Sequence, residues 1–190
     1  MFLLRLYLLA GLVAHKAVWE ALKRRPGASS TPPHPHRGFR FLLVKAVKLA
    51  ILGGIAVQTC LPDLLPISAN PLGLRIAGAV LYTAGLLTAI LARIQLGANW
   101  SDIEAAQVRP AHAVVATGIY RYVRHPIYAG DLALLFGLEL ALNSWFILGV
   151  LALTPFVLRQ AIREERQLLA SLAGYDLYCS RTRRFLPFLW

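Results

Sequence analysis

Hydrophobic positions gather into five long stretches that alternate with polar connections. Each stretch approaches the roughly 20 apolar residues that a helix needs to cross a bilayer. The pattern therefore predicts five membrane-spanning helices, over residues 2–22, about 41–61, about 72–96, about 127–142 and about 145–158.

The connections differ in length and character. Residues 23–37 are rich in prolines and basic side chains, and residues 97–125 form the longest polar connection. Only Asn143 and Ser144 separate the last two stretches, which predicts a helical hairpin. The tail over residues 159–190 is amphipathic and basic.

Composition supports a membrane protein. Hydrophobic residues make up 57% of the 190 residues and charged residues 15%, against roughly 45–50% and about 25% in soluble domains. We therefore expect one all-α integral-membrane bundle over residues 1–190. No basic region precedes the apolar run from Leu6 to Ala14 and no small-residue cleavage site follows it, which predicts a retained span rather than a signal peptide.

The net charge of +11 would suggest a nucleic-acid partner in a soluble protein. Here the five-helix topology explains it, because all of the 20 Lys and Arg residues except Arg5 and Arg75 fall on one side. Basic residues accumulate on the cytoplasmic side of membrane proteins. We thus predict an outside N-terminus, a cytoplasmic C-terminus and no nucleic-acid partner.

Two acidic residues fall inside the predicted fourth helix. Ionisable groups inside a membrane usually face a bundle interior or cavity. For Asp131, a ligand role and a structural pairing with Arg124 or Arg121 remain equally open. Glu139 is expected toward the outer end of the helix, where solvent can reach it.

No metal site is predicted. Cys60 and Cys179 fall on opposite sides of the predicted topology and have no metal or redox spacing. His34-Pro35-His36 lies in a loop without supporting carboxylates or cysteines, so we assign it no role.

Polar and aromatic residues concentrate over residues 118–130, just before the fourth helix. Pro126 is suited to the first helical turn and would fix the angle at which the chain enters the membrane. His125, between Arg124 and Tyr128, is well placed to bind an anion or a ring. The pair Glu164-Glu165 in the tail is either a solvated face stabilised by flanking arginines or part of the same site.

These residues carry a resemblance to the isoprenylcysteine carboxyl methyltransferase family, to which the phospholipid N-methyltransferases are related. The resemblance covers residues 93–190 and leaves residues 1–92, with the first spans, outside it. The motif residues are Arg93-x-x-Leu96-Gly97-x-x-Trp100-Ser101, His112-x-Val114-Val115-x-Thr117-Gly118-x-Tyr120, Arg124-His125-Pro126-x-Tyr128-x-Gly130, Glu164-Glu165, Tyr175-x-x-Tyr178, Arg184 and Pro187. Leu172-Ala173-Gly174 stands where members usually carry Phe-Gly.

The resemblance implies that residues 93–190 bind S-adenosyl-L-methionine as cofactor. Arginine can bind its carboxylate through a bidentate fork, glutamates its ammonium or ribose, and tyrosine rings its adenine or sulfonium. The implied cofactor-binding residues are His112, Gly118, Tyr120, Arg124, His125, Pro126, Tyr128, Glu164, Glu165, Tyr175 and Tyr178.

The implied reaction is methyl transfer to a lipophilic acceptor, first of all a carboxylate such as that of a prenylcysteine or a small analogue. A carboxylate needs no general base, so catalysis would rest on alignment. Arg163, Arg93 and Asn99 are the candidates that would contact or orient the acceptor. Membrane lipids and a lipophilic or lipidated substrate are the expected partners, in a multi-pass protein of a prokaryotic inner membrane with a cytoplasmic active site.

Other functions remain as alternatives. Membrane sterol reductases, which use NADPH, share an Arg-His-Pro motif followed by Gly-Asp, as in Gly130-Asp131, but are longer and lack the Glu-Glu pair. A phospholipid amine is a second class of acceptor for a methyltransferase. A non-enzymatic scaffold or transporter half would show an inverted repeat or paired broken helices, and the sequence contains neither.

Overall fold

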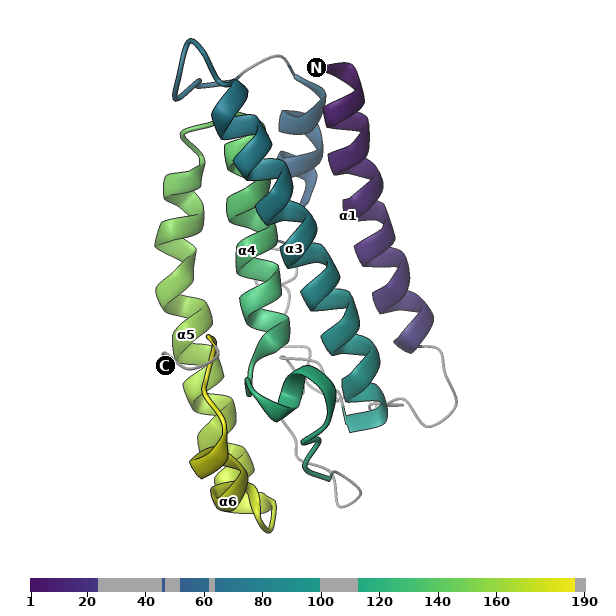
Figure 1. The fold of residues 1–190 in the computed structure, drawn as a ribbon, viewed down its shortest axis with the longest axis vertical. Helices are drawn as coiled ribbons and strands as arrows, with labels where there is room; N and C mark the ends of the chain where they lie inside the picture. Colours follow the sequence, from purple (N-terminus) through teal and green to yellow (C-terminus); the bar gives the residue numbers. More distant parts are fainter. Residues whose placement is uncertain (24–45, 47–51, 62–63, 100–112, 187–190) are drawn as a thin grey trace.

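The computed structural model describes residues 1–23, 46, 52–61, 64–99 and 113–186. Within these residues the chain is mostly helical and contains no β-strand, only isolated β-bridges. The long helices lie side by side along the longest axis of the molecule (Figure 1). They are α1 (Phe2–Lys23), α3 (Leu72–Leu96), α4 (Pro126–Ala141) and α5 (Ile147–Ser171), and the short elements are η1 (Gly97–Asn99), η2 (Gly118–Arg121) and α6 (Tyr175–Arg181).

The predicted helices agree with this architecture at most boundaries. The bounds of α3 match the prediction, and those of α1 and α4 differ from it by one residue. Residues 52–60 are helical within the second predicted stretch, while 41–45 and 47–51 lie outside the described residues. In the described part of the chain, α1 and α3 are long and apolar enough to cross a membrane, and the five-span count remains a prediction.

The fifth helix is longer than predicted. Hydropathy placed the end of the fifth span at residue 158, but α5 continues unbroken to Ser171, with Pro155 inside it. The apolar pattern stops near residue 158, whereas the helical hydrogen bonds continue through the charged sequence that follows. Figure 1 shows the C-terminal part of α5 running beyond the ends of α3 and α4, with α6 beside it.

Asn143 lies in the turn between α4 and α5, which spans residues 142–146 rather than only the predicted Asn143 and Ser144. Its backbone is left-handed, with φ of 56°, a conformation that asparagine tolerates better than most residues. Its side-chain amide donates to the Ser68 carbonyl at 2.8 Å and its Oδ1 accepts from the Ser68 N–H at 3.0 Å. The hairpin is therefore tied to the loop that precedes α3.

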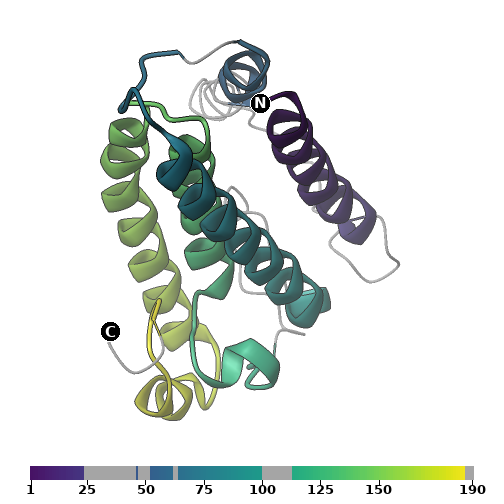
Figure 2. The ribbon, with the colours of Figure 1, turned by 45° about the horizontal axis from the view of Figure 1, so that its top comes forward.

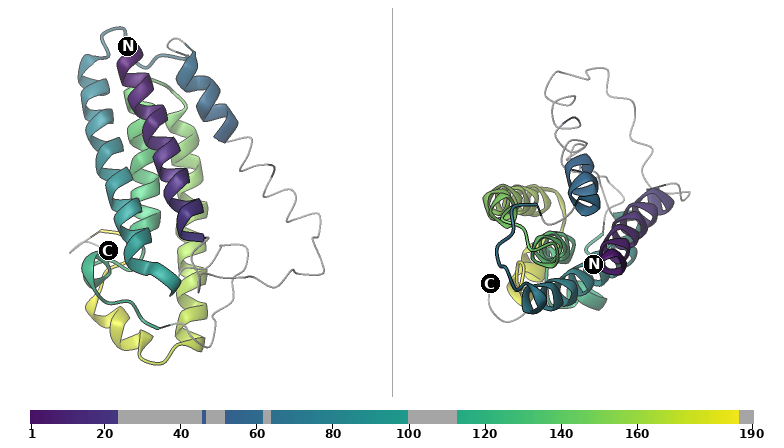
Figure 3. Two further views of the ribbon diagram at one scale, coloured as in Figure 1. Left: turned by 90° about the vertical axis from the view of Figure 1, so that its right-hand side faces the viewer. Right: turned by 90° about the horizontal axis from the view of Figure 1, so that it is seen from above.

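Glycines bring the backbones of α3 and α4 almost into contact. A methyl group added at Gly130 of α4 would lie 2.6 Å from the backbone nitrogen of Ala89 in α3. Methyl groups at Gly78, Gly85 or Gly137 would collide with the facing backbone in the same way. Small residues are typical of helix interfaces in membranes. Seen from above, α4 lies at the centre of the bundle (Figure 3).

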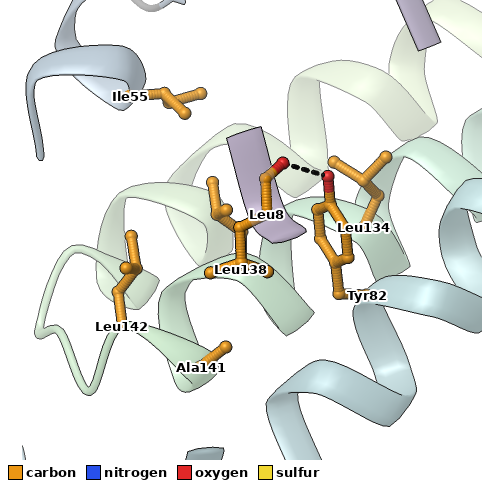
Figure 4. Close-up of a cluster of buried hydrophobic side chains, with 7 residues drawn as sticks. All are labelled: Leu8, Ile55, Tyr82, Leu134, Leu138, Ala141 and Leu142. Carbon is orange, nitrogen blue, oxygen red and sulfur yellow. Dashed lines mark hydrogen bonds between the residues drawn. The ribbon is translucent and has the colours of Figure 1, made fainter. Parts of the chain in front are cut away.

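Tyr82 of α3 attaches α1 to this pair. Its hydroxyl donates to the Leu8 carbonyl at 2.6 Å, as Figure 4 shows, and its ring packs against Gly11. A second bond joins the Tyr7 hydroxyl and Thr83 Oγ1 at 2.6 Å. The apolar cluster around Tyr82 comprises Leu8, Ile55, Leu134, Leu138, Ala141 and Leu142.

The expectation that Glu139 is solvated is wrong. Its side chain is buried, with 4% of the residue exposed, and its Oε2 accepts a hydrogen bond from Gln58 Nε2 at 2.7 Å. A buried carboxyl group requires a polar partner. Gln58 supplies it from the helical segment 52–60 and thereby links that segment to α4.

Candidate functional site

The segments singled out by the sequence meet at one end of the bundle. The C-terminal ends of α3 and α5, the N-terminal end of α4, η2 and α6 all lie there (Figures 1 and 2). Residues 113–125 and 172–186 connect these ends. The site is thus built from three helix termini and two connecting segments.

A short backbone ladder joins the segment before α4 to the segment after α6. The Arg124 N–H donates to the Arg183 carbonyl at 2.7 Å, and the His125 N–H donates to the Arg184 carbonyl at 2.9 Å. In return the Arg183 N–H donates to the Tyr122 carbonyl at 3.0 Å. The ladder places Arg124, His125 and Arg184 next to each other, directly at the start of α4.

Glu165 of α5 is the centre of the charged cluster. Its Oε1 accepts from Arg124 Nε at 2.8 Å and lies 3.2 Å from His125 Nε2, while its Oε2 accepts from Arg184 Nε at 3.0 Å. Burial opposes ionisation of this carboxyl, but the hydrogen bonds from His125, Arg124 and Arg184 outweigh it and lower its pKa to about 2. Glu165 therefore carries a stable negative charge that binds three elements together.

Arg124 also binds the C-terminal end of α6. Its Nη1 donates to the Cys179 carbonyl at 3.0 Å and to the Thr182 carbonyl at 2.5 Å. These carbonyls are the unpaired acceptors of a helix end, where a cation is favourable. Arg124 thus has protein partners on both α5 and α6.

Glu164 makes a separate contact with α4. Its Oε2 accepts a hydrogen bond from the Tyr128 hydroxyl at 3.0 Å. The Tyr128 ring lies 5.6 Å from the His125 ring, and the Phe185 ring stacks on His125 from the C-terminal segment at 5.6 Å. The site therefore combines a carboxylate with a group of aromatic faces.

Tyr178 and Tyr120 are buried next to the charged cluster and connect α6 to η2. The Tyr178 hydroxyl donates to the Tyr120 carbonyl at 2.8 Å, and both side chains are buried. Tyr175 is also buried, with its ring 5.6 Å from that of Tyr178. Burial raises the pKa of all three phenols, so they remain neutral. Gly174, in the left-handed conformation with φ of 79°, starts α6 and places both α6 tyrosines.

Gly118 is required by its backbone and by its neighbour. Its φ is 59°, in the left-handed region that favours glycine. Gln95 of α3 packs against the position that a Cβ would occupy, and its Oε1 accepts the Ile119 N–H at 2.8 Å. The motif glycine thus anchors η2 to the end of α3.

The predicted acceptor-contacting residues occupy different environments. Arg93 is 1% exposed and its Nη1 donates to the Gly97 carbonyl at 3.2 Å. Asn99 Oδ1 accepts the Ala113 N–H at 2.8 Å, which holds the start of the described 113–125 segment near η1. Arg163 is exposed on α5. His112, predicted to bind the cofactor, lies outside the described residues.

The predicted partners of Asp131 are wrong. Neither Arg124 nor Arg121 pairs with it, because Arg124 is engaged by Glu165 and α6. Asp131 Oδ1 instead lies 3.0 Å from His15 Nε2, on α1. Residues this far apart in sequence are brought together by helix packing, which no local motif encodes.

Sequence reasoning identified most of the cluster and missed several supporting residues. Gly118, Tyr120, Arg124, His125, Pro126, Tyr128, Glu164, Glu165, Tyr175 and Tyr178 do lie together at this end of the bundle. The missed residues are Gln95, Thr182, Phe185 and His15. Gln95 had one usable signal, since it is a polar residue at the end of an apolar helix two residues before a glycine.

Comparison with known proteins supports the family resemblance of residues 93–190. Residues 74–174 match the family described as phospholipid methyltransferase. The chain is also 30% identical over 101 residues to protein-S-isoprenylcysteine O-methyltransferase of Schizosaccharomyces pombe, an alignment that covers 52% of this chain and 43% of the yeast protein. The aligned part is therefore less than half of the relative. The family match spans more than half of the chain and contains the α3, α4 and α5 parts of the site, so this protein belongs to the phospholipid methyltransferase family.

Proposed function

We propose that the protein is an integral-membrane methyltransferase that moves a methyl group from S-adenosylmethionine to a lipophilic acceptor. The observation that carries the proposal is the contact between Glu164-Glu165 of α5 and Arg124, His125 and Tyr128 around the start of α4. These residues belong to the matched family region. The membrane location has the support of α1 and α3, which are long and apolar enough to span.

The chemistry of the donor set fits the cofactor. S-adenosylmethionine presents a carboxylate, an ammonium, ribose hydroxyls, an adenine ring and a sulfonium. The Arg184 guanidinium, 34% exposed, would take the carboxylate. Glu164, half-buried, would take the ammonium or the ribose. The rings of Tyr128, His125 and Phe185 would supply faces for the adenine or the sulfonium.

Glu165 has a different role in this proposal from the one predicted. Three protein donors already occupy its carboxylate, so it would hold Arg124, His125 and Arg184 in place rather than contact the cofactor itself. Tyr120, Tyr175, Tyr178 and Gly118 would act in the same way, as the frame of the site. The predicted roles of these residues thus become positioning roles.

The cofactor would supply an electrophilic methyl group. The protein's residues would then align the two reactants and exclude water, which can lower a barrier by about 7–11 kcal/mol. Arg163, Arg93 and Asn99 remain candidates for orienting the acceptor.

Two acceptor classes have support. The name of the yeast relative points to the carboxylate of a prenylated cysteine, and the family description points to a phospholipid. Neither comparison favours the reductase alternative. In either case the lipid part of the acceptor would reach the site from the bilayer, and the cofactor from the cytoplasm.

Thermal stability of the purified protein in detergent tests the proposal. S-adenosylhomocysteine at 100 times its Kd should stabilise the fold by about 2.7 kcal/mol, whereas NADPH should have no effect. Glu164→Gln should raise the Kd at least tenfold, so that the same concentration stabilises the fold by about 1.4 kcal/mol or less. Asp176→Asn, at an exposed acid on α6, should leave the stabilisation unchanged. A response to NADPH alone would sink the proposal.

A further inference from the structure

A second polar group lies on the membrane side of the Glu165 cluster. His15 Nε2 of α1 is 3.0 Å from Asp131 Oδ1 of α4. The His15 ring also stacks on Trp19, with ring centroids 4.0 Å apart and an angle of 21° between the planes. The two polar side chains are 23% and 39% exposed. They are thus ordered by their neighbours and still accessible.

The pair is close to the proposed cofactor site. Asp131 is one helical turn beyond Tyr128, whose hydroxyl binds Glu164, and this turn corresponds to a rise of about 4.5 Å along α4. The direction from His125 to Asp131 leads into the bundle, where the acceptor would lie. His15 and Trp19 precede the matched family region, which begins at residue 74.

The arrangement is suited to proton transfer. An imidazole held by a carboxylate through one ring nitrogen can present the other nitrogen to a substrate. Trp19 fixes the plane of the ring. The carboxylate of Glu165, by contrast, is occupied by three protein donors, so it is poorly placed to accept a proton.

We propose that His15 is a catalytic base that removes the proton of the methyl acceptor, and that Asp131 is the positioning residue that orients its ring. The inference rests on the proposed methyl transfer and concerns its acceptor. It predicts a nucleophile that carries a proton, such as an amine or a thiol, in preference to a carboxylate, which is already ionised.

The acceptor in this step is a neutral thiol or amine. The acceptor's lone pair forms the new bond to the methyl carbon, and the electron pair of the breaking carbon–sulfur bond stays on sulfur, which becomes a neutral thioether. The acceptor's proton passes to the free nitrogen of His15, which becomes an imidazolium paired with Asp131. Loss of this proton to water restores the base.

Other ionisable groups lie on α1 and on the helices packed at this end of the bundle. On α1, Lys16 and Glu20 bind each other at 2.9 Å on the exposed side. The packed helices bring Asp131 and Tyr128 from α4, Arg93 from α3 and Glu164 from α5 to this end of the bundle. Of these, Asp131 is the group in direct contact with the His15 ring.

Three probes of equal chain length test the assignment: dodecanethiol, dodecylamine and dodecanoate, each with labelled S-adenosylmethionine and purified protein. The wild type should methylate the thiol or the amine. His15→Gln should lower that rate about 100-fold, within the usual range for general-base catalysis, and should not slow any dodecanoate turnover. Lys16→Gln, the adjacent exposed residue, is the matched control and should leave all rates unchanged.

The pH profile separates a base from a structural residue. With dodecanethiol, the gap between the wild type and His15→Gln should shrink as the pH rises from about 6 to about 9.5, because the thiol increasingly ionises without help. Asp131→Asn should show the same convergence, and Asp131→Glu should restore part of the rate. A gap that stays constant with pH would overturn the inference.

Two readouts do not depend on turnover. Dodecanethiol should slow carbethoxylation of His15 by diethyl pyrocarbonate several-fold in cofactor-free protein. S-adenosylhomocysteine should stabilise His15→Gln as much as the wild type. Three outcomes overturn this inference alone when S-adenosylhomocysteine stabilises the wild type as expected. They are a preference for dodecanoate, no methylation of any probe, and no protection of His15 by dodecanethiol. Loss of stabilisation in the wild type overturns the proposed function as well.

Discussion

At the scale of single residues, the negative charge of Glu165 offsets the positive charges of Arg124 and Arg184. Its buried carboxylate accepts from Arg124 and Arg184 and contacts His125. These groups are held in place by the backbone ladder to residues 183–184. Of these groups, the Arg124 side chain is 9% exposed, so it would keep little access to solvent if the carboxylate were removed.

Glu165→Gln should reduce the free energy of unfolding by about 3–5 kcal/mol, because it leaves the buried guanidinium of Arg124 without a counter-charge. Glu164→Gln is the matched control. It loses a bond to a neutral hydroxyl and should cost about 1 kcal/mol. Denaturant unfolding in detergent measures both, and equal losses would contradict the central role of Glu165.

The same carboxylate predicts how stability depends on pH. Its pKa in the folded state, about 2, is below its usual value of 4.5, so its contribution is complete above pH 4.5 and is lost as the pH falls toward 2. The unfolding midpoint of the wild type should fall through this window. Glu165→Gln should give a flatter curve there, and parallel curves would refute the assignment.

At the scale of single residues, the sequence predicted which residues lie together in the candidate site. It often did not predict which protein groups they contact. Arg124, His125 and Glu165 were predicted to meet a ligand, which stays a prediction, and the structure adds that they bind one another. Motif spacing reveals that residues serve one site. It does not distinguish a residue that touches a ligand from one that positions its neighbour.

At the scale of elements, the contact between α3 and α4 determines where the site forms. Gly78 and Gly85 face α4, and Gly130 and Gly137 face α3, at a backbone separation that leaves no room for a side chain. This contact runs along both helices and holds the start of α4 beside the end of α3.

Gly137→Ala should destabilise the fold by about 1–3 kcal/mol, because the added methyl group overpacks the interface. Gly149→Ala in α5 is the control, since a Cβ there meets open space and alanine favours the helix. Thermal unfolding in detergent compares them. A Gly137→Ala protein as stable as Gly149→Ala would show that the two helices can move apart without cost.

The bounds of a helix were predicted best where the helix is apolar along its whole length. The bounds of α3 follow from its continuous apolar composition. The end of α5 does not, because that helix passes from an apolar to a charged sequence without breaking. Contacts between helices, such as Gln58 with Glu139 and His15 with Asp131, depend on packing between distant segments and were not predictable.

At the scale of the whole molecule, the charge distribution predicts which end faces the cytoplasm. Cys60 is exposed at the end opposite the candidate site, and Cys179 lies on α6 within it. A membrane-impermeant maleimide should label Cys60 in intact bacterial spheroplasts and Cys179 only after lysis. Burial raises the pKa of Cys179, so the second reaction should be slower. Labelling of Cys179 before lysis would reverse the predicted orientation.

In the proposed membrane-embedded bundle, the continuity of α5 would couple the bilayer mechanically to the site. The helix carries exposed apolar side chains at Leu148, Leu151 and Phe156 and then reaches Glu165 without a break. From Pro155 to Glu165 it spans about 15 Å, so a tilt of about 10° would move the carboxylate by about 2–3 Å. Such a displacement exceeds what its hydrogen bonds to Arg124 and His125, just before α4, can tolerate. Lipid thickness, by setting the tilt of one helix, would thus determine whether the charged cluster stays assembled.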